Sequence, residues 1–575
     1  MIPSTSQPMT AEDIAAQAAA LHRQGRFADA LDLYGRLLSG QPGNAALQGL
    51  IGALHAQMGQ AALGVEHLLQ SDALAPGNDE TLHNLATALA ACGRASEAAD
   101  AWNRLGAVRY QRRDHAGAEA VFRQALALHP GHFGAAANLG ASFQAQGRHA
   151  EAVALFTTLL DGDADEAEVH NNLGNAHMGA GALDEAIAAY RRAIALRPEY
   201  FEAYSNLGLV MARRTPPAGA SADADPVSEV RRCYERALAL RPDFAAAHWN
   251  LSLCLLLQGD YERGWPAYEW RWRWDGFGEA HRPFAQPLWR GEPPQALAGT
   301  LLLTAEQGFG DTLQFARYAA LLAGRGHDVT LEVQAPLFTL LWTSLGRHGV
   351  RVVPRAGSPA QVHDDLPFAA HVPLMSLPAR FGTRLDSIPS ACPYLFAEPS
   401  RVARWRGRLD AAAGPIVKVG LAWSGRPEHA RDRERSLPVG ALAPLLAVPG
   451  VHFFVLHKGG PPVEPRANLT PLGPMLHDFA ETAAVVDTLD LVITVDTALA
   501  HLTGGLGRRG WVLLPFSPDW RWLLDRDDSP WYPSLTLLRQ DTAGDWAPVV
   551  AEAARRLHAW VEDGGKDGVP PVRHD

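Results

Sequence analysis

The spacing of apolar and polar positions changes near the middle of the chain. Up to about residue 275 the apolar residues recur at helical spacing, in segments separated by short polar turns. From residue 299 they form short runs such as "TLLLTA", "DVTLEV" and "DLVITVD", with helical patterns between them. The first pattern predicts paired helices, and the second predicts parallel strands covered on both faces. We therefore expect an α-solenoid followed by an α/β region.

Glycines mark the predicted helix pairs at a fixed interval. Gly25, Gly59 and Gly93 lie 34 residues apart, and so do Gly147 and Gly181. The interval from 93 to 147 is 54 residues, so one repeat is expected to be shorter by 14. A period of 34 is typical of tetratricopeptide repeats, where the glycine breaks the chain between two helices. This part of the chain resembles tetratricopeptide-repeat proteins, which predicts a right-handed superhelix with a concave face.

An asparagine precedes the repeat leucine at one recurring position. The five residues are Asn84, Asn138, Asn172, Asn206 and Asn250. One interpretation is that these amides only cap or bond locally. The other is a ladder along the concave face, because an amide can pair with the backbone of an extended peptide without reading its sequence. The repeat superhelix of animal O-linked N-acetylglucosamine transferase looks similar and holds acceptor proteins in this way.

Polar residues follow four of the predicted strands in the second half. They lie in "EQGFGD" (306–311), "WSGRPEHARDRERS" (423–436), "LHKGG" (456–460) and "TVDTALAHLTGGLG" (494–507). Two sets of strands joined near 395–415 predict two Rossmann-like lobes. Ligands of such sheets bind outside the carboxyl ends of the strands, so the four segments are expected to face one cleft. Where the last segment passes from strand to helix, free backbone N–H groups can hold a phosphate.

These segments carry a resemblance to a known family. The "GD" at 310–311, the "WSG" followed by "RSLP", and "DLVITVDTALAHL" resemble the ADP-heptose:lipopolysaccharide heptosyltransferases, and more closely their relatives fused to tetratricopeptide repeats. The likeness covers about residues 298–560. It implies a GT-B fold and an inverting sugar transfer without a metal. Arg435 stands where the heptosyltransferases carry a lysine, so the sugar and the nucleotide stay open.

Asp311 is the predicted catalytic residue. It matches the family's catalytic aspartate, and an inverting transfer needs a base to take the proton of the acceptor. Gly308 and Gly310 leave the backbone bare for an acceptor to approach. Glu306 is the alternative base, or a residue that orients the acceptor. The other interpretation of Asp311 is a helix cap.

The donor side must stabilise the negative charge of a leaving diphosphate by cations and backbone N–H groups. Arg435, Arg433 and Lys458 are the predicted cations, although an arginine-rich run can also be a solvated loop. By resemblance, Asp496, Thr497 and His501 face the diphosphate; a buried, hydrogen-bonded ring is the alternative for His501. The predicted donor-binding set is Trp423, Ser424, Arg435, Lys458, Asp496, Thr497 and His501.

Metal and nucleic-acid partners are not expected. The two Asp-x-Asp pairs, at 161–163 and 223–225, lie in repeat loops rather than at strand ends. The net charge of −11 argues against a nucleic-acid binder. The start has no signal-peptide pattern, no apolar run approaches the ~20 residues of a membrane span, and four scattered cysteines fit a reducing compartment. We therefore expect a cytoplasmic location.

The sequence predicts four parts of the chain and favours one function. The repeats span 11–275, a linker 276–297, an acceptor-side lobe 298–400, and a nucleotide-sugar lobe 415–562. The favoured function is a metal-independent inverting glycosyltransferase that moves a sugar from a nucleotide-sugar to a protein held by the repeats. The alternatives are the same chemistry on a surface glycan or lipid intermediate, and an inert repeat scaffold. A small acceptor needs no solenoid, which favours the protein acceptor.

Overall fold

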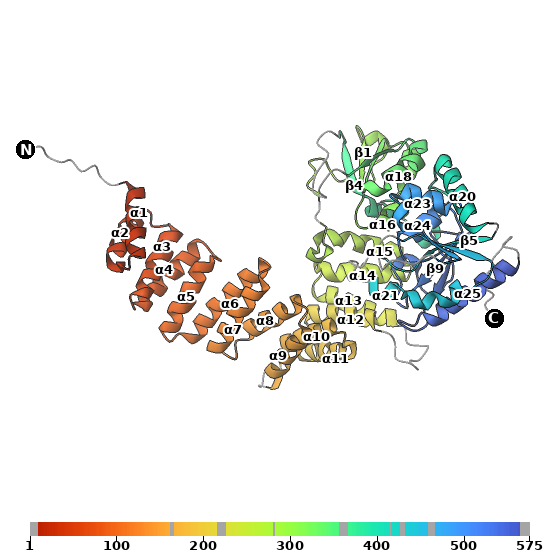
Figure 1. The fold of residues 1–575 in the computed structure, drawn as a ribbon. Helices are drawn as coiled ribbons and strands as arrows, with labels where there is room; N and C mark the ends of the chain where they lie inside the picture. Colours follow the sequence, from red (N-terminus) through yellow and green to blue (C-terminus); the bar gives the residue numbers. More distant parts are fainter. Residues whose placement is uncertain are drawn as a thin grey trace, which may run out of the picture. The chain divides into compact units, whose positions relative to one another are not determined.

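The fold was taken from a computed structural model, shown in Figure 1. It describes residues 10–161, 166–214, 226–279, 282–355, 366–414, 416–425, 432–457 and 466–563. The chain divides into two compact units, Met1–Arg214 and Thr215–Asp575.

The N-terminal unit is a row of helices in which each helix packs on its neighbour in sequence. The helices are α1 (Ala11–Arg23), α2 (Phe27–Gly40), α3 (Ala45–Gln57), α4 (Ala61–Leu74), α5 (Asp79–Ala91), α6 (Ala95–Gln111), α7 (His115–Leu128), α8 (Phe133–Ala145), α9 (His149–Asp161), α10 (Ala167–Ala180), α11 (Leu183–Leu196) and α12 (Phe201–Arg213). The predicted helical solenoid is thus confirmed for this unit.

The recurring glycines lie in the turns inside the helix pairs. Gly93 and Gly147 both have a φ of 73°, in the left-handed region that favours glycine. Between them Arg113 takes the same conformation, with a φ of 64°, in the turn from α6 to α7. Helix α6, with 17 residues, therefore pairs with α5 on one side and with α7 on the other. The predicted short repeat has lost one helix, and α6 belongs to two pairs.

Small residues let the paired helices approach closely. A Cβ on Gly174 of α10 would lie 2.6 Å from the ring of Tyr190 on α11. A Cβ on Gly140 of α8 would lie 2.2 Å from the ring of Phe156 on α9. The aromatic ring therefore occupies the space that the glycine leaves, and any larger residue would push the two helices apart.

The C-terminal unit begins with three more helices, α13 (Pro226–Leu240), α14 (Ala245–Leu257) and α15 (Tyr261–Tyr268). Tyr261, Trp265 and Tyr268 of α15 are buried in the same apolar core as the strands that follow. These three helices belong to the stretch predicted as repeats up to residue 275, and they group with the α/β region in the C-terminal unit.

The first sheet has four parallel strands in the order β3-β2-β1-β4. Its elements are β1 (Leu301–Thr304), α16 (Phe309–Phe315), α17 (Arg317–Gly324), β2 (Val329–Val333), α18 (Phe338–Leu345), β3 (Arg351–Pro354), β4 (Ala370–Pro373) and α19 (Leu377–Arg380). Part of the predicted linker extends this sheet, because the backbone N–H of Trp289 donates to the carbonyl of His371 on β4 at 2.8 Å.

The second sheet has six parallel strands in the order β10-β9-β8-β5-β6-β7. Its elements are α20 (Pro399–Ala413), β5 (Val417–Ala422), α21 (Asp432–Arg435), α22 (Ala443–Leu446), β6 (Val451–Val455), β7 (Leu469–Pro471), α23 (Phe479–Val486), β8 (Leu491–Val495), α24 (Ala498–Gly505), β9 (Gly510–Leu514), β10 (Leu535–Arg539) and α25 (Ala547–Glu562). The strand order reverses between β5 and β8. In such sheets the reversal point is where ligands bind.

Helices α16 and α24 join the two sheets by direct packing. A Cβ on Gly310 of α16 would lie 2.7 Å from Cδ2 of His501 on α24, so only glycine permits this approach. No helix within the described ranges is long and apolar enough to cross a membrane.

Candidate functional site

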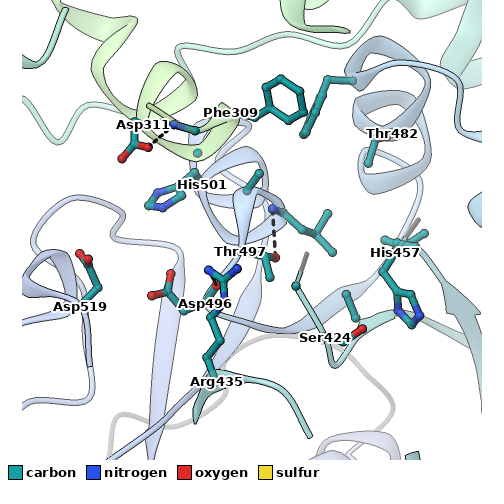
Figure 2. A pocket seen from close by; sticks show the side chains of 18 of the residues that line it. Phe309, Asp311, Ser424, Arg435, His457, Thr482, Asp496, Thr497, His501 and Asp519 are labelled. Atoms are coloured by element: carbon teal, nitrogen blue, oxygen red, sulfur yellow. Dashed lines mark hydrogen bonds between the residues drawn. The ribbon is translucent and has the colours of Figure 1, made fainter. Parts of the chain in front are cut away.

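A cavity of about 780 Å³ opens at the carboxyl ends of the strands. The start of α16 contributes one wall, and the residues after β5, β6, β8 and β9 contribute the others. It lies where the order of the second sheet reverses, between the ends of β5 and β8. Figure 2 shows Asp311 on one side of this space, with Asp496 and Arg435 facing it from the other elements.

Asp311 occupies the first turn of α16 and lines the cavity. One carboxylate oxygen accepts the backbone N–H of Gly308 at 2.7 Å, the bond dashed in Figure 2. The other oxygen accepts from Nη2 of Arg521. Burial raises the pKa of this carboxyl group above its ordinary value, and the Arg521 guanidinium opposes that shift. Asp311 therefore bonds to the start of α16, as a capping residue does, and also lines the cavity.

Arg521 is a cavity residue that was not predicted from the sequence. It belongs to the short 3-10 turn Trp520–Trp522, and its side chain is only 9% exposed. Besides Asp311, its guanidinium donates to Oδ1 of Asp519 at 2.7 Å and to Oε1 of Gln314 at 2.7 Å. Arg521 lies 210 residues after Asp311, and no spacing in the sequence indicates that pair.

The residues after β8 form the floor of the cavity. Asp496 and Thr497 both line it, and the Thr497 hydroxyl caps α24 by accepting the backbone N–H of Leu499 at 3.3 Å. Burial, and then the negative charge of Asp519, raise the pKa of Asp496 to about 6. The carboxyl group of Asp496 is therefore close to half-ionised near pH 6.

His501 is a buried, neutral ring at the edge of the cavity. Its Nδ1 lies 3.0 Å from the hydroxyl of Tyr532, and the ring stacks on Trp522. Burial, and then the Arg521 charge, lower the pKa of His501 to about 3. The hydrogen-bonded interpretation of His501 fits these contacts, and the ring still lines the cavity.

Arg435 and Ser424 line the cavity from the side of β5, as predicted. The Arg435 guanidinium donates to the carbonyl oxygen of Asp496 at 3.0 Å, which ties it to the end of β8. Trp423 does not line the cavity; it is buried in the core of the second sheet. Successive residues of an extended segment point to opposite sides, so Ser424 and not Trp423 is presented to the cavity. Lys458 lies outside the described residues.

Glu306 differs from its predicted role. It is buried outside the cavity lining, and its two oxygens accept from Nε and Nη2 of Arg271, each at 2.9 Å. The backbone N–H of Met375 donates to it as well, at 3.0 Å. Both oxygens are thus taken up by an internal ion pair, and Glu306 has no access to an acceptor. Gly308 and Gly310, by contrast, do line the cavity.

The five asparagines of the repeats are all half-buried. The four in the N-terminal unit include two whose amide groups bond to an asparagine on an earlier helix. Nδ2 of Asn138 donates to Oδ1 of Asn103 at 2.9 Å, and Nδ2 of Asn206 donates to Oδ1 of Asn171 at 3.0 Å. The remaining three are Asn84, Asn172 and Asn250. Local bonding between helices is therefore present in at least two repeats, beside any role in binding a peptide.

The cavity lining combines charged and aromatic side chains. Asp311, Asp519 and Arg521 are among the charged ones. The aromatic ones include Phe309 of α16 and Phe479 of α23, whose rings meet edge to face at 5.4 Å. Such a lining suits a ligand with a charged or hydroxylated part and a flat, less polar part. The described residues hold no cluster of side chains that fits a metal ion.

Comparisons with known proteins identify the repeats. Models described as "TPR repeat" and "Tetratricopeptide repeat" match residues 180–213, 109–175, 82–133 and 231–269. The chain therefore contains tetratricopeptide repeats, and one of them extends into α15.

One curated relative is Protein FlbA of Caulobacter vibrioides, 28% identical over 325 residues. The match covers 53% of this chain and 53% of that protein, so the chain spans about half the length of this relative. Solved structures with some likeness include pilF of Pseudomonas aeruginosa, 23% identical, covering 33% of this chain and 80% of that one, with a TM-score of 0.28. MamA of Desulfovibrio magneticus is 20% identical and covers 35% and 96%, with a TM-score of 0.21. TM-scores this low say nothing of how the chain is arranged.

Proposed function

We propose that the chain is an inverting, metal-independent glycosyltransferase with a GT-B arrangement of its two sheets. The donor is a nucleotide-sugar, and the acceptor is a protein that the repeats bind. The observation that carries this proposal is the cavity itself: the ends of two parallel sheets meet there, with a carboxylate on one side and an arginine with a capped helix start on the other.

The donor would lie along the side formed by the second sheet. Arg435 and the first N–H groups of α24 supply positive potential for a diphosphate, and the hydroxyl of Ser424 lies on the same side. The rings of Phe309 and Phe479 are suited to the nucleobase, because an aromatic ring face offers a flat apolar surface on which a base can stack. A cavity of about 780 Å³ is large enough for such a molecule.

Asp311 would act as the base toward the acceptor. Its pKa is raised by burial, which brings its proton affinity closer to that useful in a general base at neutral pH. The hydrogen bond from Gly308 fixes the carboxylate at the start of α16, so its position does not depend on a flexible loop. Glu306 is excluded as the base in this proposal, because it is buried and does not line the cavity, whereas Asp311 does.

The repeats would supply the acceptor site. Tetratricopeptide arrays offer long surfaces for protein partners, and the five half-buried asparagines have amide groups with both donor and acceptor atoms. Asn138 and Asn206 each use one N–H of Nδ2 in these bonds, and the second N–H and the carbonyl oxygen would be the groups that pair with a peptide backbone.

The proposal is tested by sugar transfer with labelled donors. The protein is incubated with each nucleotide-sugar and with protein extracted from its source cells, and label is measured separately in protein, glycan and lipid fractions. The matched variants are Asp311→Asn, which keeps the size of the side chain, and the double variant Asn138→Ala with Asn206→Ala.

We expect label in protein, its loss in Asp311→Asn by at least about 100-fold, the usual contribution of a general base, and a reduced transfer in the double variant with unchanged donor hydrolysis. Label in the glycan or lipid fraction would instead support the alternative acceptor. Absence of label from every fraction, with no nucleotide bound, would support a repeat scaffold without activity.

A further inference from the structure

Arg521 reaches from the segment after β9 to the helix that carries Asp311, and so connects the two sides of the cavity. We propose that Arg521 is the positioning residue of Asp311: its guanidinium fixes the direction of that carboxylate from the opposite wall of the cavity. This inference rests on the proposed role of Asp311 as the base.

The guanidinium is held on three sides. Nε donates to Gln314 and Nη1 to Asp519, each at 2.7 Å, and this leaves Nη2 aimed at Asp311. Because the guanidinium is planar and rigid, two fixed nitrogens determine where the third N–H group points. Gln314 lies on α16 with Asp311, so Arg521 also fixes the first turn of that helix relative to its own segment.

The segment that carries Arg521 has a rigid support. The guanidinium carbon lies 4.3 Å from the centroid of the neighbouring Trp520 ring. Trp520 is buried, and it packs edge to face against Trp265 of α15 at 5.3 Å and stacks on Phe315 of α16 at 6.4 Å. A positioning residue needs such packing, since its own rotamer must be fixed before it can fix another.

Arg521 is also the cation that pairs directly with Asp311. Several other titratable groups face this carboxylate from the elements packed around it. They are Asp519 just before the Trp520–Trp522 turn, Asp496 after β8, His501 from α24 and Tyr268 from α15. His501 remains neutral above about pH 4, and an aspartate such as Asp519 never carries a positive charge, so neither can replace the charge of Arg521. Without that charge, burial would leave Asp311 protonated at a higher pH.

A rival role is that Arg521 binds the donor phosphates, since it lines the cavity. The two roles differ in what changes when the residue is lost. A positioning residue alters kcat and its pH dependence, whereas a phosphate contact alters donor affinity. The structure favours the first role, because the three described nitrogen contacts of Arg521 already go to protein oxygens.

The experiment compares Arg521→Gln and Arg521→Lys with a matched control, Arg526→Gln. Arg526 lies in the same segment and pairs with Asp528 through two 2.6 Å bonds, but it does not line the cavity. For each protein, donor binding is measured by titration, and nucleoside diphosphate release is measured between pH 5 and 9. Thermal unfolding of Asp311→Asn, Arg521→Gln and the double variant gives a measure of the pair that needs no donor.

We expect Arg521→Gln to keep its donor Kd within about threefold while the acidic limb of kcat/KM moves up by about 1–3 pH units, the usual effect of an adjacent opposite charge on a carboxyl group. Arg521→Lys keeps the positive charge but loses the planar guanidinium with its fixed N–H groups. It should move the acidic limb of kcat/KM by less and lower kcat. Arg526→Gln should match the wild type. In the unfolding cycle the two single substitutions should not be additive.

If the acidic limb of kcat/KM does not move in Arg521→Gln and its donor Kd is at least tenfold weaker, the proposal is overturned in favour of a phosphate contact. If Arg521→Gln does not fold, Arg521→Lys with an unchanged kcat and pH profile would overturn it equally. Failure of the wild type to bind any nucleotide-sugar would refute the proposed function and, with it, this role. If Arg521→Gln and Arg521→Lys both bind the donor and turn over, and the acidic limb of kcat/KM moves in neither, only the role of Arg521 is refuted.

Discussion

The variant Glu306→Gln tests whether the Glu306 carboxylate is structural or catalytic. Glu306 and Arg271 are 3% and 0% exposed, and two 2.9 Å bonds join them. Removing one partner of a buried pair costs about 3–5 kcal/mol. Arg271 keeps a second acidic partner, because its Nη1 also donates to Glu269 at 2.7 Å, so the lower end of about 3 kcal/mol is expected. At ~2.1 cal/mol/K per residue, a cooperative unit the size of the C-terminal one has an unfolding entropy of about 0.75 kcal/mol/K. The Tm should therefore fall by about 4 °C.

Intrinsic tryptophan fluorescence is the appropriate assay, since every tryptophan except Trp102 lies in the C-terminal unit. Asp311→Asn is the matched control. The side chain of Asp311 is 18% exposed and that of Glu306 only 3%, so the Tm should fall by less in Asp311→Asn while turnover is lost. Below the new Tm, Glu306→Gln should retain nucleotide binding and turnover. A Glu306→Gln protein with an unchanged Tm and no turnover would refute the assignment and make Glu306 the base.

Three further predictions follow from the packing and the charges. Gly310→Ala should cost about 1–3 kcal/mol and weaken turnover, because α16 and α24 must separate, whereas Gly324→Ala on α17, with no atom near its Cβ, should be neutral by thermal unfolding. Trp265→Ala should cost about 3–5 kcal/mol and Trp342→Ala almost nothing, since the two are 2% and 59% exposed; equal losses would contradict the packing of α15. Asp496→Asn should raise the Tm much more at pH 7.5 than at pH 4, because a carboxyl group whose pKa is raised to about 6 in the folded protein opposes folding as the pH rises above its unfolded value of about 4; equal gains at both pH values would contradict the assigned pKa.

The repeats were predictable because their constraint is local and recurrent. A 34-residue glycine spacing reports a turn conformation that few other residues adopt, and the structure places Gly93 and Gly147 in it. The turn at Arg113 could not be predicted from the sequence, because it has the positive φ of the other turns but no glycine to mark it. Strands were less visible: β4 and β7, with 4 and 3 residues, are too short for their periodicity to be distinguished from a loop.

The candidate site was only partly predictable. Strand ends located Asp311, Arg435 and Asp496 because the carboxyl edge of a parallel sheet follows from strand order alone. The partners of the charged groups could not be read in the same way. Glu306 looks like a site residue until its partner, 35 residues earlier, is known, and Arg521 looks like a packing residue until its partner, 210 residues earlier, is known.

Titration of UDP, GDP, ADP, dTDP and their common sugars, with ligand-observed NMR, tests the central claim most directly. The account predicts that one nucleotide-sugar binds at micromolar affinity. Arg435→Ala should weaken it at least tenfold, while Asp311→Asn and Arg433→Ala should leave it nearly unchanged; Arg433 is on the same short helix but exposed and outside the cavity lining. Folded protein that binds none of these molecules, or binding that Arg433→Ala weakens as much as Arg435→Ala, would contradict the account.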